Sequence, residues 1–237
     1  MSFNKKILIA VVIAFSGCML VSCNVSTLKR PYTLSADYAS ANLSGRTVVV
    51  VLPTDKNIVI RNTDDVIDDL GGANARPESR IRKYYFPLFF DSFKSLVSSD
   101  SFFLLDQYRP GLLPDSLGQK EIILQTGDKG APTRYMLPEK ASLAAHGLDS
   151  AVLIIIERIE FKRNDFYVEN YWDLKSRRPA SLEAEALVLV WDCKKDAPVF
   201  YGPISEKVEF FLSMQRKHWE ESARLLAKRI VQAVKCL

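Results

Sequence analysis

Histidine is scarce in this sequence, with His146 and His218 as the only two among 237 residues. A hydrolytic Ser-His-Asp triad would have to use one of them. His146 precedes Gly147 near the expected end of a helix, where its partial positive charge suits the helix dipole, and His218 opens the last predicted helix. The Gly-x-Ser-x-Gly, His-Glu-x-x-His and glycine-rich phosphate-binding motifs are also absent. We therefore expect a protein that is not an enzyme and has no cofactor.

A short acidic stretch is the nearest approach to a metal site. Asp64, Asp65, Asp68 and Asp69 follow Thr63, which is expected to cap a short helix. Carboxylate oxygens are the ligands that calcium prefers, but these four residues lack the glycine-punctuated spacing of a calcium-binding loop. The sequence therefore predicts a solvated helix face and no metal.

Neither glycine nor charge of one sign is abundant. Ten glycines, 48% hydrophobic residues and 11% aromatic residues are typical of a folded module and not of a disordered tail. The formal net charge of +4 falls to +2 without Lys5 and Lys6. Such a balanced charge gives no reason to expect a nucleic-acid partner.

No apolar run near the N-terminus is long enough to span a bilayer. The stretch Ile7–Val21 is almost entirely apolar and small, yet it falls short of the ~20 residues that a spanning helix needs. Lys5 and Lys6 precede it, and the residues from Asn24 onward are polar. This arrangement predicts a secretory signal peptide over residues 1–22.

The end of that stretch, Leu20-Val21-Ser22-Cys23, resembles the lipobox of bacterial lipoproteins. The resemblance implies transfer of diacylglycerol to the Cys23 thiol, cleavage before Cys23, and acylation of the new amino group by a fatty acid such as palmitate. Two or three acyl chains on one residue anchor a protein stably, whereas a single chain holds it only marginally. We expect the mature protein to be attached to a membrane through lipid on Cys23.

Two alternatives to a lipidated Cys23 remain open. Phe15-Ser16-Gly17-Cys18 also places a small residue before a cysteine, although Phe15 suits the position three residues before the cut less well than leucine does. The segment could also be an ordinary signal peptide with a chance cysteine.

The residue after the lipidated cysteine bears on location. An aspartate there retains lipoproteins of enteric bacteria in the inner membrane, and this sequence has Asn24. By that analogy we expect the periplasmic face of the outer membrane. Residues 23–46 are rich in Ser, Asn, Thr and Ala without apolar periodicity, so we predict a flexible tether with a reach on the order of 25 Å.

Two cysteines remain in the predicted folded domain, Cys193 and Cys236. A disulfide between them is possible in an oxidising periplasm. Cys193 is predicted in a hairpin turn and Cys236 at the end of a helix, so two unpaired thiols are the alternative.

Residues 47–237 are predicted to form one globular α/β (α+β) domain with a mixed, largely antiparallel sheet flanked by helices. Val48–Leu52 is apolar on both faces, which is typical of a central, doubly covered strand. Further strands are expected at residues 58–60, 101–105, 121–124, 151–161, 182–191 and 199–210, and the main helices at 84–99, from 138 to Gly147, and from 218 onward. The alternation that begins at Glu157 indicates that its strand emerges from cover there.

The segment from Ala144 to Leu153, with its Gly147-Leu148-Asp149-Ser150-Ala151 turn, resembles a helix–turn–strand unit of lipoproteins related to the curli-secretion channel and the penicillin-binding-protein activators. The surrounding order of elements fits from about residue 47 to 234. The resemblance implies a non-catalytic module that oligomerises or docks on envelope enzymes. The sequence departs from the pattern in its extra strand at 58–60 and in having no clear glycine at the last hairpin turn.

Aromatic and basic residues gather between positions 161 and 178. Aromatic and arginine side chains are common anchors of protein interfaces. The same residues could instead form an edge hairpin whose aromatic rings cover the core. The candidate partner-binding residues are Phe166, Tyr167, Tyr171, Trp172, Arg177 and Arg178.

We therefore expect a lipid-anchored periplasmic module for protein interaction or assembly in the cell envelope, with an envelope protein or a second copy of itself as partner. The alternative is a binder of a small ligand or cell-wall fragment. In that case the long loop from Gln107 to Leu137 would form one wall of the pocket.

Replacing Cys23 with serine is expected to abolish lipidation, because a serine hydroxyl cannot replace the thiol that accepts diacylglycerol. Labelling cells with radioactive palmitate and immunoprecipitating the protein measures this. Cys18→Ser is the matched control and should keep the label. Loss of label from Cys18→Ser, with label retained by Cys23→Ser, would move the anchor to the other cysteine.

Overall fold

A computed structural model describes residues 32–38, 45–61, 70, 75–97, 101–126, 130–165, 167–168, 177–211 and 213–234. The chain divides into two compact units, residues 1–30 and 31–237, and every described residue belongs to the second. The predicted signal peptide, Cys18, Cys23 and the acidic stretch from Asp64 to Asp69 lie outside these residues. No helix within the described ranges is long and apolar enough to cross a membrane.

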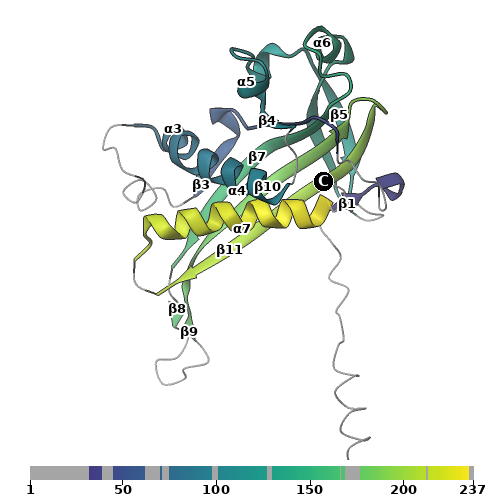
Figure 1. Ribbon diagram of the computed structural model, residues 1–237. Coiled ribbons are helices and arrows are strands. Elements are labelled where there is room, and N and C mark those ends of the chain that lie inside the picture. The colour runs from purple at the N-terminus through teal and green to yellow at the C-terminus, as the bar shows by residue number, and fades with distance from the viewer. Residues whose placement is uncertain are drawn as a thin grey trace, which may run out of the picture. The chain divides into compact units, whose positions relative to one another are not determined.

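Seven strands of the described chain form one sheet in the order β1–β11–β10–β7–β2–β4, and β3 lies beside β7 next to the end of β2 (Figure 1). β11 pairs antiparallel with β1 and β10, and β10 pairs antiparallel with β7, whereas β2 and β3 run parallel to β7 and β4 runs parallel to β2. The predicted mixed, largely antiparallel sheet is confirmed. The strands are β1 (Thr33–Leu34), β2 (Val48–Val51), β3 (Ile58–Arg61), β4 (Phe102–Leu104), β7 (Val152–Asn164), β10 (Ala180–Asp192) and β11 (Ala197–Phe210).

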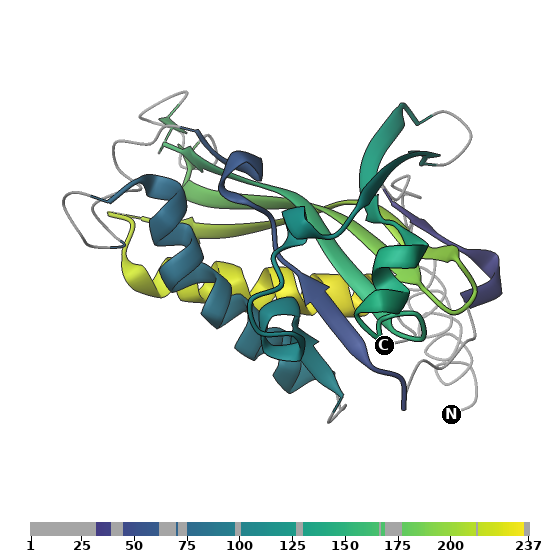
Figure 2. The same ribbon diagram turned by 90° about the horizontal axis from the view of Figure 1, so that it is seen from above.

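Two helices, α4 (Phe86–Leu96) and α7 (Arg216–Val234), cover one face of this sheet and pack against each other (Figure 2). Their apolar stripes meet the sheet in an aromatic cluster. The ring of Tyr85 lies 4.8 Å from that of Phe161, which lies 5.3 Å from that of Trp219. All three side chains are fully buried, so this face holds the larger of the two hydrophobic clusters.

The helix predicted to start at Tyr84 begins earlier than expected. Its first turn is α3 (Pro77–Arg80), and a π-helical segment, η3 (Ile81–Tyr85), connects α3 to α4. Pro87 therefore lies inside a longer helix and not in its first turn. The wide π turn, in which the Phe86 N–H donates to Ile81 O five residues earlier, accommodates a proline that has no N–H to donate.

A smaller layer covers one end of the other face. It consists of α5 (Leu105–Tyr108), η4 (Pro114–Ser116), the hairpin β5 (Gln119–Gln125) and β6 (Pro132–Pro138), and α6 (Lys140–Ala145). Leu137 and Leu148 from this layer pack on Leu153 and Leu189 of the sheet. Gly147 ends α6 with a positive φ of 69°, as the sequence predicts for a helix cap.

A β-bulge marks where this cover ends. Ile156 pairs with Val188 and Arg158 pairs with Leu187, so Glu157 is an extra residue in β7. The Glu157 carboxylate accepts a hydrogen bond from the backbone N–H of Met136 in β6, which ties the hairpin to the bulge. Beyond Glu157 every second residue of β7 is polar, and the predicted emergence from cover is confirmed.

The N-terminal segment joins the folded unit earlier than the sequence predicts. Residues 32–38 lie within the predicted tether, but β1 pairs with Tyr201 and Phe200 of β11, and η1 (Ala36–Tyr38) follows it. Tyr38 is 2% exposed. This stretch therefore belongs to the folded unit, because Tyr38 has a buried partner in the last hairpin.

That partner is Asp192, a fully buried carboxylate at the end of β10. It accepts a hydrogen bond of 2.8 Å from the Tyr38 hydroxyl and forms an ion pair of 2.7 Å with Arg46. Its other oxygen accepts the backbone N–H groups of Lys194 and Lys195 at 3.0 and 3.2 Å. Burial alone would raise the pKa of Asp192, but these hydrogen bonds and the Arg46 charge lower it to about 2.

The hairpin turn itself has no glycine. Asp196, with a φ of 51°, occupies the left-handed conformation there instead, which aspartate tolerates better than most residues. Lys194 and Lys195, which precede Asp196 in the turn, are held by the hydrogen bonds that their backbone N–H groups donate to Asp192. The missing glycine noted in the sequence is therefore compatible with a tight turn.

The Asp192 cluster is expected to make stability depend on pH. The folded pKa of about 2 lies below the ordinary value of 3.8, so the stabilisation is present above pH 4 and is lost as the pH falls through about 2. Asp192→Asn should lower the free energy of unfolding by about 2 kcal/mol at pH 7, and by much less at pH 2. Urea denaturation at both pH values measures this.

Asp37→Asn, which removes an exposed neighbouring carboxylate, is the control for the Asp192 variant and should change little at either pH. An equal loss of stability by Asp192→Asn at pH 7 and pH 2 would contradict a role for the charge.

Candidate functional site

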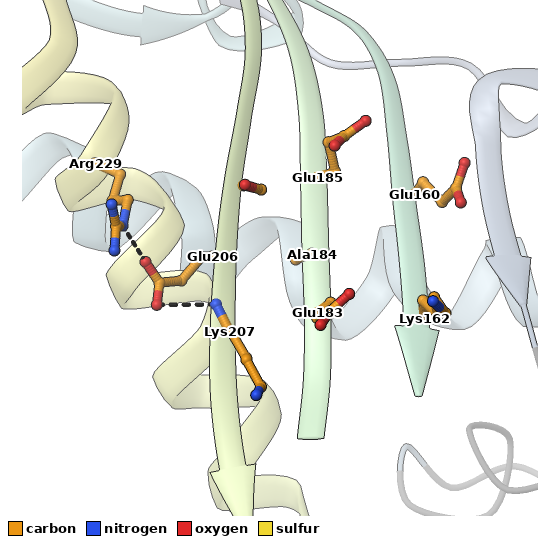
Figure 3. A pocket seen from close by; sticks show the side chains of 9 residues that line it. Glu160, Lys162, Glu183, Ala184, Glu185, Glu206, Lys207 and Arg229 are labelled. Atoms are coloured by element: carbon orange, nitrogen blue, oxygen red, sulfur yellow. Dashed lines mark hydrogen bonds and ion pairs between the residues drawn. The ribbon is translucent and has the colours of Figure 1, made fainter. Parts of the chain in front are cut away.

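The half of the sheet beyond the bulge has an uncovered face made by β7, β10 and β11. Its side chains are charged or polar, and they line a shallow pocket of about 480 Å³ (Figure 3). We call this surface the open face. It comprises Glu160 and Lys162 of β7, Glu183 and Glu185 of β10, and Ser205 and Lys207 of β11.

The strand register arranges these residues in two rows across the sheet. In one row Lys162 lies opposite Glu183, which lies opposite Lys207. Opposite charges alternate along this row, which stabilises neighbouring strands. Each cross-strand pair in this row is therefore attractive.

The second row does not alternate in charge. Glu160 lies directly opposite Glu185, which lies opposite Ser205. Arg61 of β3 hydrogen-bonds to Glu160 and is the main cause of a lowered pKa of that carboxyl, and Arg158 pairs with the same carboxylate at 3.7 Å. Among the described residues, Glu185 has no ion pair, and a like charge directly across the sheet is destabilising. The exposed Glu185 is thus a negative charge available to a positively charged partner.

The edge of the open face is closed on the α7 side. Glu206 of β11 points toward α7, and its side chain is 8% exposed. Its carboxylate pairs with Arg229 of α7 and accepts the backbone N–H of Lys207 at 2.9 Å (Figure 3). This ion pair joins the rim of the open face to the helix layer.

A two-stranded hairpin, β8 (Tyr167–Val168) and β9 (Arg177–Arg178), continues from the open face. Asn164 pairs with Ser181 and Tyr167 pairs with Arg178, so β8 and β9 extend the β7–β10 ladder in the same register. In Figure 1 they lie at the far end of β7 and β10, past α7. The predicted hairpin is therefore a continuation of two central strands.

The six candidate partner-binding residues are divided between this hairpin and the part of the chain outside the described residues. Tyr167, Arg177 and Arg178 lie in β8 and β9, and Phe166, Tyr171 and Trp172 lie outside the described residues. The interface and the core-covering roles of this segment both stay predictions.

A second pocket lies at the β4 edge of the sheet. It has a volume of about 370 Å³ and lies between α4 and the segment from Leu104 to Pro114. Gln107, Leu112 and Leu113 line it, so the first part of the predicted 107–137 loop does form a pocket wall. The later part of that loop is the β5–β6 hairpin.

Both histidines take part in local structure. The Nδ1 atom of His218 accepts the backbone N–H of Gln215 at 2.9 Å just before α7, and the backbone carbonyl of His146 accepts Arg109 Nε at 2.9 Å. Ser222, four residues after His218, is buried and lies within hydrogen-bonding distance of the Tyr85 hydroxyl. Within the described ranges no group of three or more His, Cys, Asp or Glu side chains is placed to hold a metal ion.

Cys193 is a buried thiol beside the Asp192 cluster. Burial raises its pKa to about 12, so the thiol stays protonated at neutral pH. Its predicted partner Cys236 lies outside the described residues, and the disulfide stays a prediction.

No family model and no curated protein matches the sequence. Similar solved structures include a PelC dodecamer from Paraburkholderia phytofirmans (9% identity, TM-score 0.33, 87% of this chain and 96% of that chain). They also include the hypothetical protein CT253 from Chlamydia trachomatis (10%, TM-score 0.34, 80% and 98%). A third is a Helicobacter pylori homologue of a neuraminyllactose-binding hemagglutinin (12%, TM-score 0.38, 82% and 84%). These values indicate a distant likeness.

The ion pair at the rim of the open face is expected to contribute to stability. Arg229→Ala leaves the nearly buried Glu206 carboxylate without its cation and should lower the free energy of unfolding by about 1–2 kcal/mol. Arg216→Ala is the matched control, because Arg216 and Glu220 form an exposed pair on the same helix whose loss should change stability by under about 0.5 kcal/mol. Chemical denaturation of both variants measures this, and equal effects would contradict a special role for Arg229.

Proposed function

We propose that this chain is a lipid-anchored, non-catalytic lipoprotein of the cell envelope, attached through Cys23 to the periplasmic face of the outer membrane. It acts there as a protein-interaction or assembly module. The lipobox-like Leu20-Val21-Ser22-Cys23 supports the anchor. The open face supports the interaction, because three long strands present charged side chains that no described helix covers.

The observation that carries the proposal is the Glu160–Glu185 pairing. Glu160 is compensated by ion pairs with Arg61 and Arg158, whereas Glu185, directly opposite in the sheet, has no cation among the described residues. A partner that brings a lysine or arginine to Glu185 would neutralise this unpaired charge and gain a charge-assisted hydrogen bond. Charged groups in this arrangement steer and orient a partner more than they add affinity.

The β8–β9 hairpin adds a second contact to this proposal. It extends the same two strands that carry Glu160 and Glu185, and its sequence holds the aromatic and arginine residues expected of interface anchors. A partner docked on the open face would therefore meet the hairpin as well.

A second function is favoured by a different observation. The pocket between α4 and Gln107–Pro114 has the size of a small-molecule site. We propose as the alternative that the protein binds a small ligand or cell-wall fragment there.

Crosslinking in living cells tests the interaction module. Tagged full-length protein is crosslinked, purified and identified by mass spectrometry, in parallel with Cys23→Ser and Glu185→Gln. We expect a defined adduct, either a partner or a self-multimer, that is lost without the lipid. Glu185→Gln should reduce the adduct at least about fivefold while leaving thermal stability unchanged or slightly raised, because it removes a like-charge contact.

Glu221→Gln is the matched control, since Glu221 is an exposed glutamate on α7, on the other face of the sheet. It should leave the adduct intact. Tyr171→Ala with Trp172→Ala tests the hairpin: a lower melting temperature with an unchanged adduct would show that these rings cover the core. Lone monomer from every version, lipidated or not, would overturn the interaction function.

A further inference from the structure

The connections that follow β2 and β4 lie on opposite faces of the sheet. After β2 the chain first forms β3 and then passes through α4 on the α7 side to reach β4, and after β4 it continues through α5 and the β5–β6 hairpin on the other side. Figure 1 shows α4 and α5 on either side of β4. Connections that part in this way leave a crevice outside the carboxyl ends of parallel strands, which is where ligands bind in open α/β sheets.

The 370 Å³ pocket occupies that crevice. Val50 near the end of β2 and Leu104 at the end of β4 form its floor, and Phe86 and Phe90 of α4 form one wall. Phe90 is held in place by stacking on Phe102, with ring centroids 5.2 Å apart. The crevice therefore presents a preformed apolar interior to a ligand.

The two walls of the pocket each carry an exposed carboxylate. Asp91 of α4 and Asp106 of α5 line the pocket from opposite walls, and both are exposed. Within the described residues neither forms an ion pair. The cation that also lines the pocket, Arg82, is engaged elsewhere, since it pairs with Asp55 at 2.8 Å and donates to the carbonyl of Pro53 at 3.0 Å. The pocket thus combines an apolar interior with two uncompensated carboxylates.

We propose that this crevice binds a small amphipathic cation, whose apolar body lies between Phe86, Phe90 and Leu104 and whose amine lies between Asp91 and Asp106. The proposal rests on the second function given above and specifies its ligand class. An ammonium group placed between two carboxylates makes charge-assisted hydrogen bonds to both. The apolar body gains by leaving water.

Three probes with one apolar body and different charges test this ligand class. Benzylamine, benzyl alcohol and benzoate are titrated calorimetrically into the full chain in phosphatidylcholine nanodiscs, with empty nanodiscs as the blank. We expect benzylamine to bind at least about tenfold more tightly than benzyl alcohol, and benzoate to bind more weakly than both. Equal binding of all three, a preference for benzoate, or no heat above the blank would overturn the proposal.

Variants then locate the site. Asp91→Asn with Asp106→Asn should bring the amine and alcohol affinities within about twofold of each other without changing that of the alcohol. Asp149→Asn removes an exposed aspartate outside the pocket and should keep the tenfold preference. Leu113→Trp, at an exposed position of the pocket rim, should weaken binding of the amine and the alcohol by filling the entrance. An unchanged preference in the double variant would overturn the assignment.

Circular dichroism and thermal melts establish that each variant is folded, and the comparison of the three probes on the unaltered chain decides the ligand class without any variant. The titrations need no partner protein. A crosslinked partner together with no benzylamine binding would therefore remove the ligand site alone. Benzylamine binding to a chain that yields only monomer on crosslinking would remove the interaction module and leave the ligand site standing.

Discussion

The buried carboxylate of Asp192 connects the elements that make this fold one unit. It receives hydrogen bonds from Tyr38, from Arg46 and from the turn that joins β10 to β11. Arg46 also donates to the carbonyl of Ser150 at 2.7 Å, just before β7. A buried charge is stable only when its hydrogen bonds are satisfied, so the N-terminal segment, the entrance to β7 and the last hairpin must all be in place together.

The cover over the sheet changes along the length of β7 and β10, starting from the end at Asp192. Near Asp192 both faces are covered, and beyond the bulge at Glu157 one face is left to solvent. The two proposed sites follow from the two ways in which cover is incomplete. The open face lies where the hairpin layer stops, and the crevice lies where the connections after β2 and β4 diverge. A partner would therefore use the open face of β7, β10 and β11, and a small ligand the end of the sheet formed by β2 and β4.

Local patterns in the sequence predict the elements well and their long-range partners poorly. The valine run of β2 and the alternation after Glu157 show burial directly, because each side chain's environment follows from its own strand period. The pairing of Tyr38 with Asp192 spans 154 positions and has no local signal. The pairing of Glu160 opposite Glu185 depends on a register that a one-residue bulge shifts. The pocket depends on which face each connection crosses, which composition does not encode.

Residues 32–38 pack against the last hairpin at the start of the folded unit, and this has a mechanical consequence. Tension applied through the N-terminal segment would first load the two-residue strand β1, which offers little resistance. It would next meet the ring and hydroxyl of Tyr38, held by Asp192 and covered by the Lys195 ammonium 4.6 Å from the ring centroid. The force would then pass into the turn of the longest hairpin and not into the aromatic core under α7. If the proposed lipid anchor holds the chain, the load would enter the sheet at the Asp192 end of β10 and β11, whereas Glu185 and Ser205 of the open face lie in the other half of these two strands.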